Sequence, residues 1–473
     1  MCSETASGGF HMRIHMLGIG GTGMGSLAGL FSEAGHTVTG TDQQLYPPMS
    51  DQIASLGIAP FEGYRAENIE AARPDLVVIG NVIRRDNPEA EEAIRRKLPY
   101  LSMPQALAEH FLAGRTPLVI AGTHGKTTCA TLAAWLLTEA DEKPGFLIGG
   151  VGKNLGRSYE VGSGQFFVVE GDEYDTAFFD KGPKFLHYRP QAAIITSIEF
   201  DHADIYRDVD HITSSFERLA KILPPDGLLV INAACERAMR VAKEAPCRTV
   251  SYGTDAKALY RPLDVEVTEA GTSFELGTAR TRFRIPMWGE HNLENAAGVL
   301  ALLIESGVDP AMLTRGIENF EGVKRRQELL GEADGVAVID DFAHHPTAVA
   351  KTIDAIRLRF PRRRIWAIFE PRSNTSRRNV FQHEFARSLA RADRVIVASP
   401  YLAEKIPDEE RLDSAAVAAE VNEAGTGAVH IELVDDIVAH LMKHALKGDV
   451  LLIMSNGGFG GLHGRLLEAL AKR

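Results

Sequence analysis

The chain has 473 residues, a length that corresponds to about three domains at roughly 150 residues each. Its composition, 45% hydrophobic and 24% charged, is that of a globular protein and excludes a disordered, collagen-like or coiled-coil chain. The 63 acidic residues outnumber the 51 lysines and arginines, for a formal net charge of -12. This balance disfavours nonspecific binding to nucleic acid or to an anionic membrane, so we expect no partner of either kind.

The cysteines and the N-terminal segment indicate a cytoplasmic protein. Cys2, Cys129, Cys235 and Cys247 form no C-x-x-C pair and no zinc spacing, which favours a reducing compartment over a disulfide framework. Residues 1–12 lack the basic and apolar regions of a signal peptide, and the sequence has no run of about 18 apolar residues.

The first predicted unit, residues 13–42, is a strand, a glycine turn, a helix and a second strand. Gly18, Gly20 and Gly23 form the spacing G-x-G-x-x-G before the helix, and Asp42 ends the second strand. Together they make the dinucleotide-binding fingerprint, which alone favours an oxidoreductase. The fingerprint is not specific to dinucleotides, because the glycines let the backbone approach any pyrophosphate at a helix N-terminus. A plain tight turn is the structural alternative.

Strands and helices continue to alternate, which predicts a mostly parallel sheet with helices on its faces. The run DLVVIGN at residues 75–81 is typical of a buried strand, and residues 87–97 are typical of a helix. The stretch AGRTP at residues 113–117 is predicted to be a linker.

A second segment opens with a strand and the loop GTHGKTT, residues 122–128. Successive backbone N-H groups of such a loop, placed between a strand and a helix, cradle phosphate oxygens. Lys126 is then expected to reach the β- and γ-phosphates of ATP, and Thr127 to bind magnesium. The loop is shorter than the common G-x-x-x-x-G-K-[ST] pattern, because Ile120 stands five residues before Gly125.

Three further apolar runs, at residues 165–173, 192–202 and 227–233, end in polar residues. The carboxyl ends of parallel strands lie at one edge of a sheet, so these polar groups are expected to converge on one site. Magnesium prefers oxygen ligands, and we select Glu173 and His202 as its protein ligands. The other polar groups are expected to cap helices or to support those ligands: Asp172, Asp175, Glu199, Asp201 and Asp204.

Residues 249–288 alternate in the manner of a small antiparallel sheet, and residues 289–307 predict an amphipathic helix. His291, Asn292 and Asn295 lie at the start of this helix. Asn292 fits a helix N-cap as well as a ligand contact. Asn295, one turn later, fits the edge of an adenine.

From Arg326 onward, strands and helices alternate again and predict a third α/β domain. Asp341 is a candidate for binding ribose hydroxyls, and Arg326 or His344 for binding a phosphate, with surface ion pairing as the alternative. The basic run PRRRI at residues 361–365 is more typical of a solvated face than of an anion site.

These motifs together resemble the Mur ligase family, the ATP-dependent amide ligases of bacterial peptidoglycan synthesis. The resemblance covers nearly all of residues 13–470 and rests on six segments in the family's order: GIGGTGMGSLA, GTHGKTT, EGDEYD, IEFDH, GEHNLENA and DDFAHHPT. It implies an α/β protein of three domains: a Rossmann-like UDP-sugar-binding domain (13–115), a central P-loop ATPase-like domain with a parallel sheet (116–325) and a C-terminal Rossmann-like peptide-binding domain (326–473). Ser197 departs from the family, which usually has Asn at this position.

The resemblance also implies the site residues. Lys126, Glu173 and His202 are expected to be catalytic, and Thr127, Glu173 and His202 are expected to bind Mg²⁺, with two ions in all. The residues expected to bind ATP are Gly122, Thr123, His124, Gly125, Lys126, Thr127, Thr128, His291, Asn292, Asn295, Arg326, Asp341 and His344. Those expected to bind the UDP-sugar are Gly18, Gly20, Gly21, Gly23 and Asp42.

Within the family, DDFAHHPT points to the two ligases that accept UDP-N-acetylmuramate. One adds L-alanine, and the other adds a recovered tripeptide, L-alanyl-γ-D-glutamyl-meso-diaminopimelate, in peptidoglycan recycling. The tripeptide-adding ligase is the one resembled at residues 40–53, 80–89, 178–190, 369–375 and 454–464. Arg372, Asn374 and Asn456 are therefore expected to contact the peptide, Arg372 through a diaminopimelate carboxylate.

The reaction implied by the resemblance has two steps. The lactoyl carboxylate of UDP-N-acetylmuramate attacks the γ-phosphate of ATP and gives an acyl phosphate and ADP, and the free amine of the peptide then displaces phosphate. The first alternative is the L-alanine ligase of the same family. An NAD-dependent dehydrogenase is a second, but it leaves GTHGKTT without a role, and a non-catalytic sensor of ATP and a UDP-sugar is a third.

Overall fold

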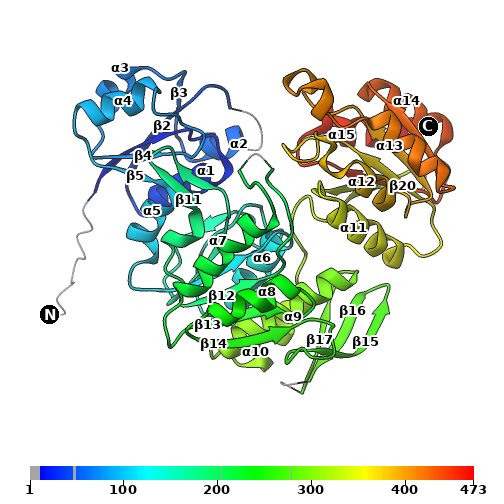
Figure 1. The fold of residues 1–473 in the computed structure, drawn as a ribbon, viewed down its shortest axis with the longest axis horizontal. Coiled ribbons are helices and arrows are strands. Elements are labelled where there is room, and N and C mark those ends of the chain that lie inside the picture. The colour runs from blue at the N-terminus through cyan, green and yellow to red at the C-terminus, as the bar shows by residue number, and fades with distance from the viewer. Residues whose placement is uncertain (1–10, 46–48, 204, 278–279) are drawn as a thin grey trace.

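The computed structural model describes residues 11–45, 49–203, 205–277 and 280–473, so the predictions for Cys2 and Asp204 lie outside the described residues. Three large sheets, each flanked by helices, confirm the predicted three-domain α/β architecture. In Figure 1 the N-terminal domain (blue) and the C-terminal domain (orange to red) lie on either side of the central domain (green).

The N-terminal domain contains a parallel sheet in the order β3-β2-β1-β4-β5. Local signals fix several helix ends: the Asn87 side chain accepts from the amides of Glu89 and Ala90, and Ser102 forms a capping box with Gln105. The strands are β1 (Arg13–Leu17), β2 (Thr37–Asp42), β3 (Phe61–Glu62), β4 (Leu76–Ile79) and β5 (Tyr100–Ser102). The helices are α1 (Thr22–Glu33), α2 (Met49–Ser55), α3 (Ala66–Ala72), α4 (Pro88–Arg95) and α5 (Met103–Leu107).

The central domain is a sheet in the order β14-β13-β12-β6-β9-β7-β8, in which β8 alone pairs antiparallel. Its strands are β6 (Thr116–Ala121), β7 (Gly145–Leu147), β8 (Tyr159–Glu160), β9 (Phe166–Gly171), β12 (Ala192–Ile195), β13 (Leu228–Asn232) and β14 (Arg248–Tyr252). Its helices are α6 (Lys126–Glu139), α7 (Val209–Lys221), α8 (Glu236–Val241), α9 (Glu290–Glu305) and α10 (Pro310–Glu318). A hairpin of β10 (Asp175–Ala177) and β11 (Asp180–Pro183) follows β9.

Two expectations for this domain need correction. The linker predicted over residues 113–117 is wrong at its end, because Thr116 and Pro117 are the first residues of β6 and pair with β9. Proline is tolerated near the start of a strand. Helix α9 is not amphipathic: it is buried continuously from Asn292 to Leu303, because it packs against the sheet and also against α6 and α10.

The predicted small antiparallel sheet is confirmed. It consists of β15 (Pro262–Thr268), β16 (Gly271–Leu276) and β17 (Thr281–Ile285), which form a separate antiparallel sheet.

The C-terminal domain has a sheet in the order β18-β19-β23-β20-β21-β22, with β18 antiparallel to β19 at one edge. Its strands are β18 (Glu328–Ala333), β19 (Val336–Asp341), β20 (Ile365–Phe369), β21 (Arg394–Ala398), β22 (Gly427–Ile431) and β23 (Val450–Met454). Its helices are α11 (Pro346–Arg359), α12 (Gln382–Leu389), α13 (Ser414–Glu423), α14 (Val434–His444) and α15 (Leu462–Ala471).

The domains are joined in different ways. One hydrophobic cluster runs from Phe31 of α1 to Phe167 of β9, so the N-terminal and central domains share a core, whereas the C-terminal sheet has its own clusters. The connection to the C-terminal domain is short. The Lys324 amide donates to Val151 O of the central domain, while the Arg325 side chain donates to the carbonyls of Ser455 and Gly457 in the C-terminal domain.

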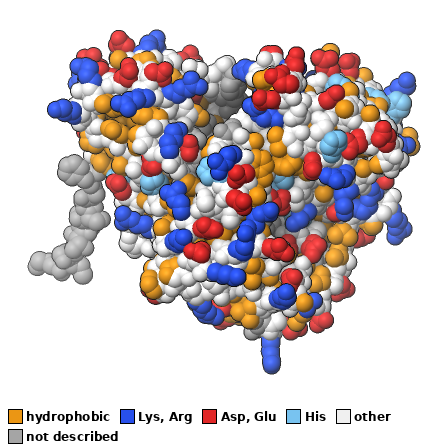
Figure 2. All heavy atoms as spheres, in the orientation of Figure 1, with side chains coloured by type: hydrophobic (Ala, Val, Ile, Leu, Met, Phe, Trp, Pro, Cys, Tyr) orange, Lys and Arg blue, Asp and Glu red, His pale blue; other side chains and the backbone are white. Residues whose placement is uncertain are grey.

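Acidic and basic side chains are interspersed over the face shown in Figure 2, without a large region of one sign. Within the described part of the chain, every helix is too short or too polar to cross a bilayer.

Candidate active site

A cavity of about 510 Å³ lies where the three domains meet. Thr22 and Gly23 line it from the N-terminal domain, and Asn374 and Asn456 line it from the C-terminal domain. Every residue expected to bind ATP lines it except Gly122, which is the first residue after β6.

The loop between β6 and α6 has the backbone that a phosphate cradle needs. Gly122 and Gly125 have φ of 127° and 81°, values that favour glycine. A Cβ on Gly125 would also lie 2.6 Å from Asn295 Oδ1. The hydroxyl of Ser197 accepts a hydrogen bond from the His124 amide at 3.2 Å, so the residue that departs from the family pattern still anchors the loop.

Of the three residues predicted to be catalytic, Lys126 and His202 each contact Glu173. The Lys126 ammonium donates to both Glu173 oxygens, at 3.0 and 2.9 Å, and to the Gly122 carbonyl at 2.6 Å. His202 Nε2 lies 3.1 Å from Glu173 Oε1. Burial works against the charged form of Lys126, but Glu173 and Asp172 outweigh it and raise the Lys126 pKa.

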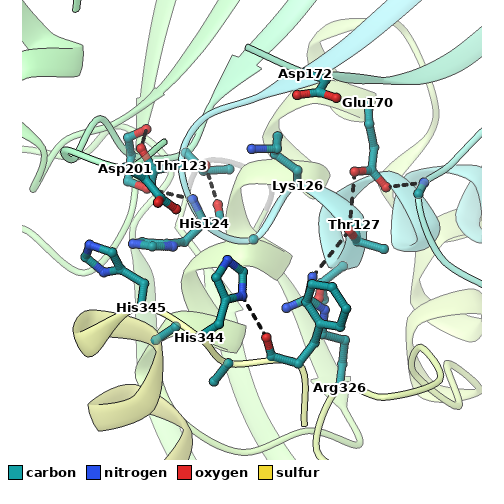
Figure 3. A pocket seen from close by; sticks show the side chains of 18 of the residues that line it. Thr123, His124, Lys126, Thr127, Glu170, Asp172, Asp201, Arg326, His344 and His345 are labelled. Atoms are coloured by element: carbon teal, nitrogen blue, oxygen red, sulfur yellow. Dashed lines mark hydrogen bonds between the residues drawn. The ribbon is translucent and has the colours of Figure 1, made fainter. Parts of the chain in front are cut away.

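Sequence reasoning missed Glu170, which completes this group. It lies in β9 opposite Ile120 of β6, close to the start of α6 (Figure 3). One carboxylate oxygen accepts from the Thr127 hydroxyl at 3.3 Å and the other from the Gly149 amide at 2.6 Å. Burial raises the Glu170 pKa and outweighs the opposing effects of the Gly149 amide, Lys126 and Arg326; among the described residues no lysine or arginine is bonded to this carboxylate.

These donors fit a magnesium ion. The Thr127 hydroxyl and the carboxylates of Glu170 and Glu173 are oxygen ligands of the kind that Mg²⁺ prefers. A divalent cation would also supply the positive charge that Glu170 lacks. The signal in the sequence was an acidic residue inside the apolar run FFVVEG, on the strand next to the phosphate loop.

One alternative considered for the start of α9, that Asn292 is its N-cap, needs correction. The N-cap of α9 is Gly289, so Asn292 is not the cap. Its side-chain amide instead donates to the Trp288 carbonyl at 2.8 Å. Asn295 Oδ1 accepts from Cys129 Sγ at 3.4 Å, and His291 Nε2 lies 3.0 Å from the Gln327 side-chain amide.

The C-terminal domain closes the cavity from the other side. Figure 3 shows Asp172 and Glu170 on one side of Lys126, and Arg326 and His344 on the other. Arg326 Nη2 reaches the Thr127 hydroxyl at 3.5 Å. Asp341 is buried, and its two oxygens accept from the amides of Gln327 and Ala343, so it already fixes the strand-to-loop turn.

Two contacts connect the central and C-terminal domains beside the cavity. Glu199 accepts from the Thr347 hydroxyl at 2.7 Å and lies 3.3 Å from His124 Nε2, with His345 close by. Asp201 Oδ1 accepts from the Thr375 hydroxyl at 2.9 Å and from the His202 amide at 2.7 Å. The expectation that Asp201 supports a neighbouring group agrees with these bonds.

His124, Glu199 and His345 have ligand atoms within 4.8 Å of one another. The nitrogens of His345 already accept from the Thr347 amide and contact the Phe200 carbonyl, so this cluster holds the interface together.

Several amides of the glycine loop already donate hydrogen bonds within the N-terminal domain. Asp42 Oδ2 accepts from the Gly20 amide at 2.8 Å, and the Gly21 amide donates to Gly18 O at 3.2 Å. Helix α1 begins at Thr22, and Thr22 and Gly23 line the cavity. The amides of this first turn have no acceptor within the helix, so they are the ones available to a ligand there.

Of the residues expected to contact a peptide, Asn374 and Asn456 line the cavity, whereas Arg372 is not one of its lining residues. The Arg372 guanidinium stacks on the Tyr401 ring, 3.7 Å from its centroid, beside Gly457. Asn456 Oδ1 is buried without a hydrogen-bond partner among the described residues. An unpaired buried oxygen is costly unless a bound group satisfies it.

Sequence models of three domains match the chain: "Mur ligase family, catalytic domain" at residues 13–115, "Mur ligase middle domain" at 120–303 and "Mur ligase, glutamate ligase domain" at 325–457. The chain is 42% identical to the UDP-N-acetylmuramate–L-alanyl-γ-D-glutamyl-meso-2,6-diaminoheptandioate ligase of Escherichia coli, over 98% of this chain and 99% of that protein. It is 36% identical to a UDP-N-acetylmuramate–L-alanine ligase of Rubrobacter xylanophilus, over 84% and 86%.

A crystal structure of a murein peptide ligase from Psychrobacter arcticus 273-4 is similar along nearly the whole chain. The identity is 37% and the TM-score is 0.73, over 98% of this chain and 99% of that one. With three matched domains and relatives similar along nearly its whole length, this chain belongs to the Mur ligase family, whose members are ATP-dependent and form an amide bond.

Proposed function

We propose that this protein joins UDP-N-acetylmuramate to L-alanyl-γ-D-glutamyl-meso-diaminopimelate with consumption of ATP. The observation that carries the proposal is the cavity between the three domains, where Lys126 and His202 both contact Glu173 at the phosphate loop. Identity to the tripeptide ligase, 42% over 98% of the chain, exceeds that to the alanine ligase, 36% over 84%.

Each domain then has one substrate. Residues 13–115 bind the UDP-sugar, with the pyrophosphate at the first turn of α1. Residues 116–325 bind ATP on the loop before α6. Residues 326–473 bind the tripeptide near Arg372, Asn374 and Asn456 and place its amine at the cavity.

The protein supplies positioning and charge. The lactoyl carboxylate attacks the γ-phosphate, ADP leaves, and an acyl phosphate forms; the peptide amine then attacks the acyl carbon and phosphate leaves. A carboxylate is unreactive toward amines until one oxygen becomes a good leaving group, which explains the order. Lys126 holds the transferring phosphoryl, whose oxygens replace Glu173 as its partners.

Mg²⁺ would be held by Thr127, Glu170 and Glu173, with His202 beside them, and when bound it neutralises charge on the phosphates. Because its substrates are ATP and a UDP-sugar, we place the protein in the cytoplasm.

The test is phosphate release from ATP with magnesium and UDP-N-acetylmuramate, with either the tripeptide or L-alanine as acceptor. We expect release with the tripeptide, little with L-alanine, and an amide product by mass spectrometry. Lys126→Met is expected to abolish release, whereas Lys143→Met, an exposed lysine of the same domain, leaves it unchanged. Preference for L-alanine would contradict the acceptor assignment, and no release with either would favour a non-catalytic sensor.

A further inference from the structure

Lys184 is a largely buried cation that the reaction above does not use. It is the first residue after β11, and its side chain is 16% exposed. Its ammonium donates to Asp172 Oδ2 at 2.7 Å and lies 5.7 Å from the centre of the Tyr174 ring. The Tyr174 ring is in turn 4.1 Å from the His202 ring, so Lys184 belongs to the same cavity as the phosphate loop.

The two ammonium groups bond to different carboxylates. Lys184 donates to Asp172, whereas Lys126 donates to both oxygens of Glu173. An ammonium has three N-H donors. Among the described residues, Asp172 is the one hydrogen-bond acceptor of Lys184, so two donors are left for a ligand.

The turn that begins with Lys184 also packs against α5 of the N-terminal domain, the domain proposed to bind the UDP-sugar. Thr22 and Gly23 of α1 and Met103 of α5 line the cavity together with Lys184. If the pyrophosphate lies on the first turn of α1 and the γ-phosphate on Lys126, the muramic acid spans the space between them. Its lactoyl group is the only part of that sugar with a negative charge.

We propose that Lys184 binds the lactoyl carboxylate of the UDP-sugar and holds it against the phosphate loop. This inference rests on the proposed function and names the residue that selects an acidic sugar over a neutral one. Lys181 of the same hairpin provides the contrast, because its side chain is 67% exposed and pairs with Asp175 at 3.1 Å.

Two ligands that differ only in the lactoyl group test the proposal. UDP-N-acetylglucosamine lacks this group, and UDP-N-acetylmuramate carries it. Calorimetric titration of both ligands against the wild type and Lys184→Met forms a cycle that isolates the contact between lysine and carboxylate. We expect Lys184→Met to weaken UDP-N-acetylmuramate binding by about 10- to 100-fold, the loss typical of a hydrogen bond to a charged group. Binding of UDP-N-acetylglucosamine is expected to change by less than about twofold.

Lys181→Met is the matched control and is expected to bind both ligands as the wild type does. Because Lys184→Met leaves the partly exposed Asp172 without its partner, the double variant Lys184→Met/Asp172→Asn is measured beside it and is expected to show the same loss of discrimination. Lys184→Arg, which keeps the charge, is expected to retain preference for UDP-N-acetylmuramate.

Equal weakening of both ligands by Lys184→Met would assign Lys184 a structural role and overturn the proposal, as would unchanged discrimination. A wild type that binds both ligands equally would overturn the proposed function and this inference together. If the wild type prefers UDP-N-acetylmuramate to UDP-N-acetylglucosamine and Lys184→Met shows the same preference, the inference alone is overturned.

Discussion

Thr375 connects the candidate peptide-binding loop of the C-terminal domain to the catalytic edge of the central domain. Its hydroxyl donates to Asp201 Oδ1 at 2.9 Å and accepts from the Ala203 amide at 3.4 Å. Thr375 and Asp201 are 3% and 4% exposed. Because Asp201 also accepts from the His202 amide, this contact couples domain closure to the position of His202.

Thr375→Val keeps the side-chain shape and removes both hydrogen bonds. A hydrogen bond to a charged group contributes about 1.5–3 kcal/mol, and the loss here leaves a buried carboxylate short of one donor. At about 1.4 kcal/mol per factor of ten, the ratio of closed to open molecules is expected to fall by about 10- to 150-fold. We expect kcat/KM for tripeptide-dependent phosphate release to fall by a similar factor, because catalysis needs groups from both domains.

The assay is phosphate release under subsaturating tripeptide, with small-angle scattering to measure compaction in the presence of ATP. UDP-N-acetylmuramate binding is expected to stay unchanged, because among the described residues the Thr375 hydroxyl bonds to Asp201 and Ala203 of the central domain. Thr314→Val, which removes a helix-internal hydrogen bond in α10, is the matched control. A value of kcat/KM within about twofold of the wild type, with normal compaction, would refute the reasoning.

Three other changes are informative. Gly125→Ala is expected to abolish ATP binding, because position 125 has a φ of 81° and the new Cβ would lie 2.6 Å from Asn295 Oδ1. Gly35→Ala, where φ is 87° and the Cβ would meet open space, should only lower thermal stability. Normal nucleotide titration of Gly125→Ala would contradict this prediction. Burial lowers the His345 pKa to about 4. Between about pH 6.5 and 4 the unfolded chain therefore takes up a proton that the folded protein does not. As the pH is lowered through this range, the free energy of unfolding decreases by up to about 1.4 kcal/mol per pH unit. His345→Asn keeps a helix cap, and urea unfolding should show a shallower acid dependence; equal slopes would count against it. Arg372→Ala should raise KM for the tripeptide by more than about tenfold with KM for ATP unchanged, and Tyr401→Phe, which keeps the stacked ring, should behave as the wild type.

Much of the site follows from sequence because neighbouring parallel strands bring their carboxyl ends together. Lys126, Glu173 and His202 follow β6, β9 and β12, and these strands are adjacent in the sheet. Spacing and residue type were therefore sufficient to select Glu173 and the two side chains that contact it, Lys126 and His202.

The residues that were missed depend on pairing and packing that a single sequence does not contain. Glu170 stands within an apolar run, and only the register that pairs it with Ile120 brings it to Thr127. Lys184 is one of two lysines in the same hairpin, and its burial depends on how the N-terminal domain covers it. Helix α9 has polar residues on its first turn, yet it is enclosed on all sides because elements far apart in sequence cover it.

The short connection after α10 has a mechanical consequence. Lys324 is tied by its amide to the central domain, and the next residue, Arg325, is tied by its guanidinium to the C-terminal domain. We therefore expect any rotation between these bodies to occur at one or two peptide units, so that few backbone torsions have to be sampled. An acceptor bound to the C-terminal domain, as proposed, would then return to the same point over the phosphate loop with little loss of conformational entropy in each turnover.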